Sequence, residues 1–213
     1  MFRDRADAGD RLAEHLQEYA NRDDVVVMGL PRGGIPVAFQ IAQKLRAPLD
    51  VLLVRKLGAP GQPELAMGAV APGGVRILDR TLINKLRLSE EELAKTIDVE
   101  ERELQRRELF YEDIRPFIAI KDKIVIVVDD GIATGASMMA AVAVLRTSQL
   151  KKIVVATPVA PPHAKHDLLK TADEFICLHI SDYFPAVGFF YQDFAQTSDE
   201  EVRSLLSQST SNM

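Results

Sequence analysis

The fold is decided by the stretch Val127-Val128-Asp129-Asp130-Gly131-Ile132-Ala133-Thr134-Gly135-Ala136-Ser137. An apolar run ends here in two carboxylates, a short loop between two glycines carries a hydroxyl side chain, and a helical pattern follows. The backbone N–H groups of residues 134–137 can converge on one anion at the positive end of that helix. Gly131 and Gly135 let the chain turn tightly around the anion. The stretch therefore predicts a phosphate site at the carboxyl end of a buried strand.

On both sides of this stretch, short apolar runs alternate with helical patterns. Wholly apolar or β-branched runs predict strands, and patterns with helical spacing lie between them. This alternation predicts a doubly wound α/β fold with a five-stranded, mainly parallel sheet, whose ligand crevice lies at the carboxyl ends of the strands. The predicted strands are 25–29, 49–54, 123–128, 152–157 and 175–180, and the predicted helices are 35–45, 136–146, 163–171 and a first amphipathic helix ending near Asn21.

A long insert, residues 57–122, interrupts the alternation between the second and third strands. It begins with a Gly/Pro-rich loop at 58–63, which we expect to be mobile, followed by extended runs at 67–71 and 75–78. A long charged helix follows at 89–111. The capping box formed by Ser89 and Glu92 starts it, and one apolar stripe runs along it. Its charged residues indicate a solvated face, with a closing lid or a dimer surface as alternatives.

The chain end differs from the rest in composition. Residues 181–194 hold six of the thirteen Phe and Tyr residues of the chain, and a polar helix is expected at 198–206. We therefore predict an α/β core over residues 1–180 and a small C-terminal hood and tail over residues 181–213.

Composition narrows the class of protein. The 213 residues carry a net charge of −5, which argues against nucleic acid or an anionic membrane as the main partner, because both attract a basic face. The only cysteine, Cys177, excludes disulfide bracing and favours a cytoplasmic location. The charged N-terminus and the lack of a long apolar run indicate neither a signal peptide nor a membrane span.

The two adjacent carboxylates distinguish this phosphate site from the common nucleotide-binding loops. Asp129 and Asp130 would repel a phosphate at contact distance, so they are better suited to a ribose diol that donates hydrogen bonds. No Lys follows the second glycine as in a Walker A loop, and the dinucleotide fingerprint is absent. The combination of apolar strand, Asp-Asp-Gly-x-x-Thr-Gly-x-Ser and helix resembles the signature of type I phosphoribosyltransferases, which bind phosphoribosyl pyrophosphate (PRPP).

This resemblance implies a role for each part of the signature. Asp129 and Asp130 would bind the ribose hydroxyls and stabilise the positive charge that develops on the sugar. Mg²⁺ would be carried mainly by PRPP itself, near these two carboxylates, without a dedicated protein site. The 5-phosphate would be bound by Gly131, Ile132, Ala133, Thr134, Gly135, Ala136 and Ser137.

The pyrophosphate needs a second anion site at the same edge of the sheet. The loop after the first strand offers Pro31, Arg32, Gly33 and Gly34, and the family commonly has a cis peptide in this loop, here expected between Pro31 and Arg32. Arg55 and Lys56 follow the second strand. They are expected to act with the acidic pair as catalytic residues that hold the leaving group, or else to be surface charges that end a strand.

The acceptor is the least determined part of the reaction. Family members recognise it with a terminal hood, so Phe189, Phe190 or Tyr191 would stack on a planar ring, unless they pack a small core instead. The whole chain resembles a bacterial branch of the family, and this resemblance names no acceptor. It implies a cytoplasmic, homodimeric, Mg²⁺-dependent enzyme of nucleotide metabolism that transfers the phosphoribosyl group of PRPP to a nitrogenous acceptor. The alternative is a PRPP sensor without catalysis.

Overall fold

The computed structural model describes residues 1–114 and 118–211. In this part of the chain, parallel strands form a five-stranded sheet in the order β2-β1-β6-β7-β8. Successive side chains of β1 alternate between two hydrophobic cores, with Val25 and Val27 in one and Val26 and Met28 in the other. Burial on both faces explains the continuous apolar runs. The strands are β1 (Val25–Gly29), β2 (Leu49–Val51), β6 (Ile124–Val128), β7 (Lys152–Ala160) and β8 (Glu174–Ile180).

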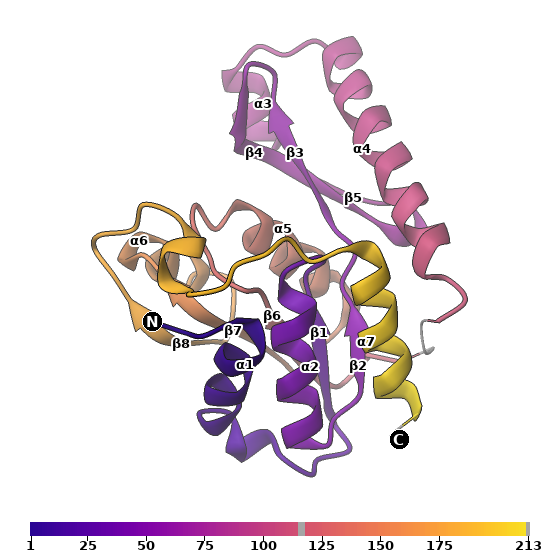
Figure 1. Cartoon of the computed structure of the whole chain (residues 1–213). Coiled ribbons are helices and arrows are strands. Elements are labelled where there is room, and N and C mark those ends of the chain that lie inside the picture. The colour runs from indigo at the N-terminus through magenta and orange to yellow at the C-terminus, as the bar shows by residue number, and fades with distance from the viewer. Residues whose placement is uncertain (115–117, 212–213) are drawn as a thin grey trace.

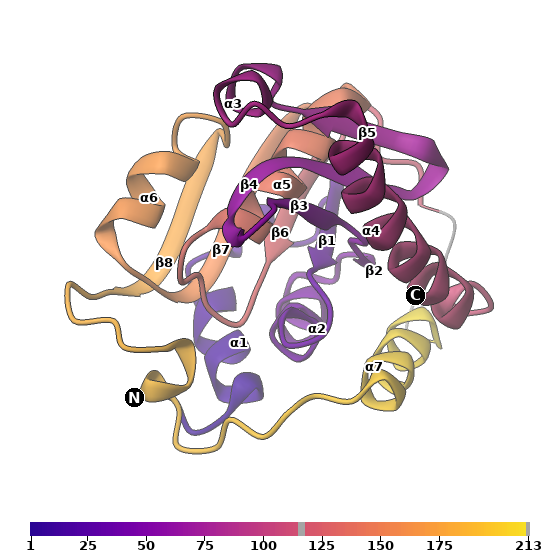
Figure 2. The same ribbon diagram turned by 90° about the horizontal axis from the view of Figure 1, so that it is seen from above.

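Helices cover both faces of this sheet, which confirms the doubly wound α/β prediction (Figures 1 and 2). Helices on the same face as Val25 and Val27 are α1 (Arg5–Glu14), α2 (Gly34–Leu45) and α7 (Asp199–Ser211). The other face packs against α5 (Ala136–Leu145) and α6 (Pro162–Leu168). In residues 1–114 and 118–211, no helix combines the length and the apolar character that crossing a bilayer would require.

The insert stands above the carboxyl ends of the parallel strands (Figure 1). The extended runs expected at 67–71 and 75–78 fall in β4 (Gln62–Ala71) and β5 (Val75–Leu78), which form an antiparallel sheet with β3 (Arg55–Ala59). This sheet carries α3 (Arg80–Lys85) and α4 (Glu90–Tyr111). The predicted capping box at the start of α4 is confirmed. The apolar stripe of α4 joins the core of the parallel sheet at Leu93, Ile97, Leu104 and Tyr111.

Two sequence predictions next to the site are wrong. The strand predicted at 49–54 ends at Val51, because its neighbour β1 ends at Gly29 and turns away. The loop predicted at 58–63 is a tight hairpin in which Ala59 pairs with Gln62. Gly61 supplies the positive φ of 75° that this turn needs.

Both chain ends deviate from the predicted boundaries. The first helix ends at Glu14, and a 3₁₀ turn, η1 (Gln17–Tyr19), keeps the predicted apolar residues facing the same core. Beyond β8, an irregular segment with the short turn η4 (Val187–Phe190) leads to α7, which extends past the predicted end at residue 206. Phe2 hydrogen-bonds to this segment through Phe190 and Gln192, so the N-terminus holds the hood. Two further 3₁₀ turns are η2 (Pro72–Gly74) and η3 (Arg146–Ser148).

Candidate functional site

The signature loop forms a hollow at the end of β6. Residues 131–138 and Asp129 line this hollow, whose volume is about 180 Å³. Gly135 precedes α5 with a φ of 79°, a conformation that side chains other than glycine rarely adopt. The Thr134 hydroxyl accepts a hydrogen bond from the Ala136 N–H at 3.3 Å, while the exposed Ser137 stands at the first turn of the helix. The predicted phosphate loop thus surrounds one small cavity at a helix N-terminus.

The structure separates the two carboxylates that the sequence treats alike. Asp129 lines both the hollow and a neighbouring cleft. Asp130 is turned toward α1, where its Oδ2 accepts a hydrogen bond from Arg5 Nε at 2.8 Å. Burial raises the pKa of Asp129 well above its usual range, and the charge of Asp130 adds to the effect. Burial also raises the pKa of Asp130, although Arg5 opposes it.

The glycine-rich loop after β1 lies against this acidic pair. The peptide bond between Pro31 and Arg32 is cis, as expected. A Cβ atom on Gly33 would lie 2.0 Å from Oδ2 of Asp130, so only glycine fits between the two loops without displacing that carboxylate. Leu30 and Pro31 line the cleft next to Asp129, whereas Arg32 is not among the described residues that line it.

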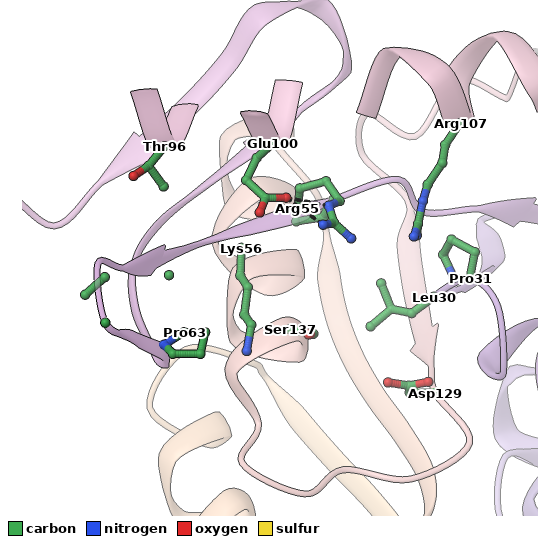
Figure 3. A pocket seen from close by; sticks show the side chains of 14 residues that line it. Leu30, Pro31, Arg55, Lys56, Pro63, Thr96, Glu100, Arg107, Asp129 and Ser137 are labelled. Atoms are coloured by element: carbon green, nitrogen blue, oxygen red, sulfur yellow. Dashed lines mark hydrogen bonds and ion pairs between the residues drawn. The ribbon is translucent and has the colours of Figure 1, made fainter. Parts of the chain in front are cut away.

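The cleft above these loops has a volume of about 360 Å³ (Figure 3). Arg55 and Lys56 line it, although they begin β3 instead of following β2. They face Asp129 and Ser137 across the cavity. The structure therefore brings the predicted basic pair, Asp129 and the phosphate loop together, whereas Asp130 faces Arg5. The predicted binding role of each residue stays a prediction.

Helix α4 supplies lining residues that the sequence reasoning missed. Thr96, Glu100 and Arg107 project into the cleft from a polar stripe beside the apolar stripe of α4 (Figure 3). The interpretation of the charged residues of this helix as a solvated face does not hold for Glu100 and Arg107. The spacing of four and seven residues places all three on one side of a helix, which was the available signal.

The aromatic stretch of the hood lies elsewhere. Phe190 and Tyr191 are buried in a small core with Phe2 and Val159, and the Tyr191 hydroxyl donates a hydrogen bond to the Asp130 carbonyl at 2.6 Å. Phe189 is half exposed, and its ring contacts that of Phe190. The residues that line the cleft are others. Phe190 and Tyr191 therefore pack a small core, which was the alternative to stacking on the acceptor. Stacking on an acceptor stays a prediction.

Comparisons with known proteins agree with this architecture. Residues 3–193 match the family model described as the phosphoribosyl transferase domain. Two Mycobacterium tuberculosis proteins, named "Putative phosphoribosyl transferase MT0597" and "Putative phosphoribosyl transferase Rv0571c", are each 46% identical over 210 residues, which cover 97% of this chain and 46% of theirs. The chain thus spans about half the length of these relatives.

One solved structure is similar to this chain over nearly the whole length of both proteins. The crystal structure of TT1426 from Thermus thermophilus has a TM-score of 0.89 and 42% identity, and the match covers 97% of this chain and 98% of that one. The family model itself spans α1, the parallel sheet, the insert and the aromatic part of the hood. The chain therefore belongs to the phosphoribosyl transferase domain family.

Proposed function

We propose that this chain binds PRPP in the cleft and transfers its 5-phosphoribosyl group to a nitrogenous acceptor with release of pyrophosphate. One observation carries the proposal: Asp129 lines both the phosphate-loop hollow and the cleft of basic residues. A ligand with a phosphate at one end and a diphosphate at the other would pass over this carboxylate. The names of the M. tuberculosis relatives support the same class of reaction.

The ligand would be held at both ends. Its 5-phosphate would accept hydrogen bonds from the backbone N–H groups of the loop from Gly131 to Ser137, at the N-terminus of α5. Its diphosphate would contact Arg55 and Lys56 beside the loop of Leu30 and Pro31. The ribose would lie between these ends, with its hydroxyls donating hydrogen bonds to Asp129.

This arrangement suits the departure of pyrophosphate. Breaking the bond at the anomeric carbon leaves a sugar with oxocarbenium character, and the carboxylate of Asp129 stabilises that positive charge. Arg55 and Lys56 stabilise the negative charge that develops on the leaving group. Asp130 supports the reaction less directly, because Arg5 already occupies one of its oxygens.

A magnesium ion fits the donor set of the site. The carboxylate of Asp129 faces the cleft, and Mg²⁺ prefers oxygen ligands while it retains several waters. We propose that PRPP brings most of the ligands and that Asp129 is the main protein contact, with Asp130 close by. When bound, Mg²⁺ would neutralise part of the diphosphate charge.

The test combines binding and turnover. Titration calorimetry with PRPP and Mg²⁺ should show binding by the wild-type chain, and pyrophosphate release should appear with one member of a panel of purine, pyrimidine and pyridine bases. Asp129→Asn should lower turnover by at least about 100-fold, because it removes the charge next to the developing cation. Asp10→Asn is the control, since Asp10 pairs with Lys44 on the surface.

The outcomes separate the alternatives. Absence of PRPP binding would overturn the proposal. Tight binding without turnover on any base would favour a PRPP sensor over an enzyme. A homodimer, a cytoplasmic location and a role in nucleotide metabolism are further proposals, and light scattering on the purified chain tests the first of them.

A further inference from the structure

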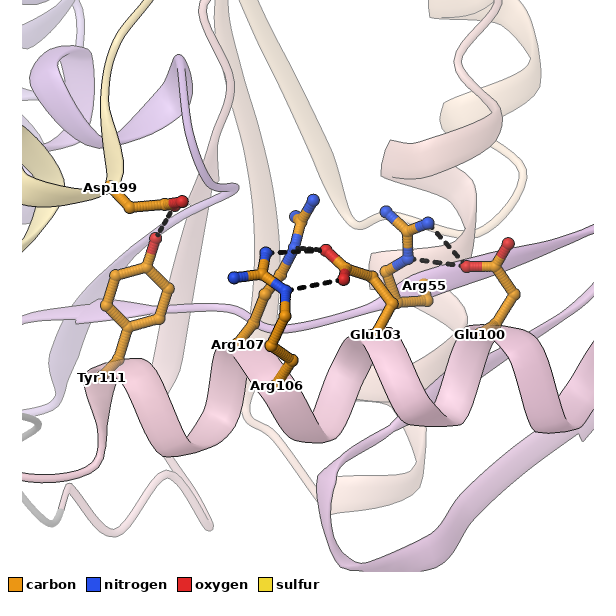
Figure 4. Close-up of polar contacts among 7 residues, drawn as sticks. All are labelled: Arg55, Glu100, Glu103, Arg106, Arg107, Tyr111 and Asp199. Atoms are coloured by element: carbon orange, nitrogen blue, oxygen red, sulfur yellow. Dashed lines mark hydrogen bonds and ion pairs between the residues drawn. The ribbon is translucent and has the colours of Figure 1, made fainter.

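The cations that line the cleft are each held by a glutamate of the insert. Among the described residues, the cationic side chains of the lining are Arg55, Lys56 and Arg107. Arg55 Nη2 lies 2.6 Å from Glu100 Oε2, Lys56 Nζ lies 2.8 Å from Glu64 Oε1, and Arg107 Nε lies 2.8 Å from Glu103 Oε1. Figure 4 shows the two arginine pairs along α4. An anion entering the cleft would therefore meet cations that already have partners.

Arg107 is placed to contact the same ligand group as Arg55. Its guanidinium points from α4 toward the loop that carries Leu30 and Pro31 (Figure 3). Only about a quarter of the Arg107 side chain is exposed, and the cleft is on its open side. A planar guanidinium binds phosphate oxygens well. Arg107 thus adds a second guanidinium, beside Arg55, to the end of the cleft where the diphosphate would lie.

Glu103 can release Arg107 without losing its own charge partner. Arg106 also holds Glu103, through Nε at 2.8 Å and Nη2 at 3.0 Å. Together the two arginines lower the pKa of Glu103 to about 2, so the carboxylate stays ionised. When Arg107 turns to a ligand, Glu103 keeps its two bonds to Arg106. The pair is therefore arranged for exchange of partners.

Glu64 competes at the other end of the cleft. Its second oxygen accepts a hydrogen bond from the Thr134 hydroxyl at 3.3 Å, so Glu64 bridges Lys56 and the phosphate loop. A phosphate oxygen would use the same two donors. Because the Glu64 side chain is 64% exposed, it can swing into solvent when a ligand arrives.

We propose that Arg107 binds the diphosphate of PRPP and that Glu64, Glu100 and Glu103 are affinity-determining residues, which compete with the phosphates for the cations of the cleft. This inference rests on the proposed PRPP-binding function. The competition weakens the hold on the pyrophosphate product and so speeds its release. Each pair is partly exposed, so each glutamate lowers affinity by a modest factor, about two- to fivefold.

The two members of a pair give opposite predictions. Loss of the carboxylate frees the cation and tightens binding, whereas loss of the cation weakens binding. If Glu103 and Arg107 only stabilised the fold, both losses would act in the same direction. This difference in sign distinguishes competition for the ligand from a structural role.

The experiment is calorimetric titration of the full chain with two probes, pyrophosphate with Mg²⁺ and ribose 5-phosphate. Glu100→Gln and Glu103→Gln should each bind pyrophosphate about two- to fivefold more tightly, with ribose 5-phosphate unchanged. Glu64→Gln should tighten both probes, because Glu64 also contacts Thr134. Arg107→Ala should weaken pyrophosphate binding about tenfold or more.

A matched control lies on the same helix. Glu101→Gln breaks a pair with Arg76 away from the cleft and should leave pyrophosphate affinity within about twofold of the wild type. Arg106→Ala removes the second partner of Glu103, so Glu103 should hold Arg107 more firmly and pyrophosphate should bind more weakly. If wild-type protein binds PRPP but Glu103→Gln and Arg107→Ala shift affinity in the same direction, or not at all, the competition of the glutamates is overturned while the proposed function stands. If the wild type does not bind PRPP, the proposed function fails as well.

Discussion

At the scale of single residues, Asp129 lowers the stability of the fold at the position where we propose that it binds the ligand. Burial raises its pKa above the value in the unfolded chain, so the folded protein holds this proton more tightly. Such a group stabilises the fold fully below the unfolded pKa, near about 4, and loses that contribution as the pH rises through the folded pKa. At neutral pH, the burial of this carboxyl group therefore costs folding free energy.

Asp129→Asn should consequently be more stable than the wild type at pH 7. The amide oxygen can still accept the hydrogen bond from the Asp130 N–H, which Oδ1 accepts at 2.9 Å. The gain should shrink as the pH falls toward about 4, because Asp129 is then protonated in both states. Thermal melts across this range check the prediction. A variant that is less stable than the wild type at pH 7 would contradict it.

The residues of the site differ in how far a sequence can predict them. The loop from Asp129 to Ser137 is contiguous, so its backbone chemistry can be deduced from local spacing, and the structure does place it around one hollow. Arg5 lies 125 positions from its partner Asp130. Arg107 reaches the cleft only because the insert folds over the sheet. Local spacing groups Arg107 with Thr96 and Glu100 on one side of α4, but no local pattern shows what that side faces or that Arg5 meets Asp130.

At the scale of elements, buried strands and capped helices were predictable, whereas the first hairpin of the insert was not. Helix α4 follows its capping box and apolar period, and β1 and β6 follow from runs buried on both faces. The residues from 55 to 66 lack such a period. Their strands depend on cross-strand pairing, as in the register of Arg55 with Val70, and that pairing is set by tertiary contacts.

Tyr111 joins two of these elements. It is fully buried at the end of α4, and its hydroxyl donates a hydrogen bond to Asp199 Oδ1 at the start of α7, at 2.7 Å (Figure 4). Tyr111→Phe should lower the free energy of unfolding by about 1.5–3 kcal/mol, the usual range for a hydrogen bond to a charged group. Denaturant unfolding measures this loss.

A double-mutant cycle isolates the contact. Asp199→Ala should lower the free energy of unfolding by a similar amount. The double variant should lose clearly less than the sum of the two single losses, because the hydrogen bond can be lost only once. Asp199→Asn keeps an accepting oxygen but loses the charge, so it should lose only part of the stability, about 1 kcal/mol. Additive losses would show that Tyr111 stabilises the protein through packing alone.

At the scale of the whole molecule, Arg5 ties both chain ends to the site. Its Nε binds Asp130, its Nη1 donates a hydrogen bond to the Ala195 carbonyl at 2.6 Å, and its guanidinium lies 3.9 Å from the centre of the Phe194 ring. The ion pair is buried, with 12% of the Arg5 side chain and 14% of the Asp130 side chain exposed. One residue thus holds α1, the hood and the signature loop together.

Arg5→Ala should therefore destabilise the protein by about 3–5 kcal/mol at pH 7, since it leaves a buried carboxylate without its partner. Arg3→Ala is the matched control, because the pair of Arg3 with Asp4 is exposed and its loss should change stability little. Arg5 opposes the burial that raises the pKa of Asp130, so its loss raises that pKa further. The deficit should then shrink as the pH falls and Asp130 takes up a proton. Equal losses in Arg5→Ala and Arg3→Ala, or a deficit that is constant with pH, would show that the clamp does not depend on this buried charge pair.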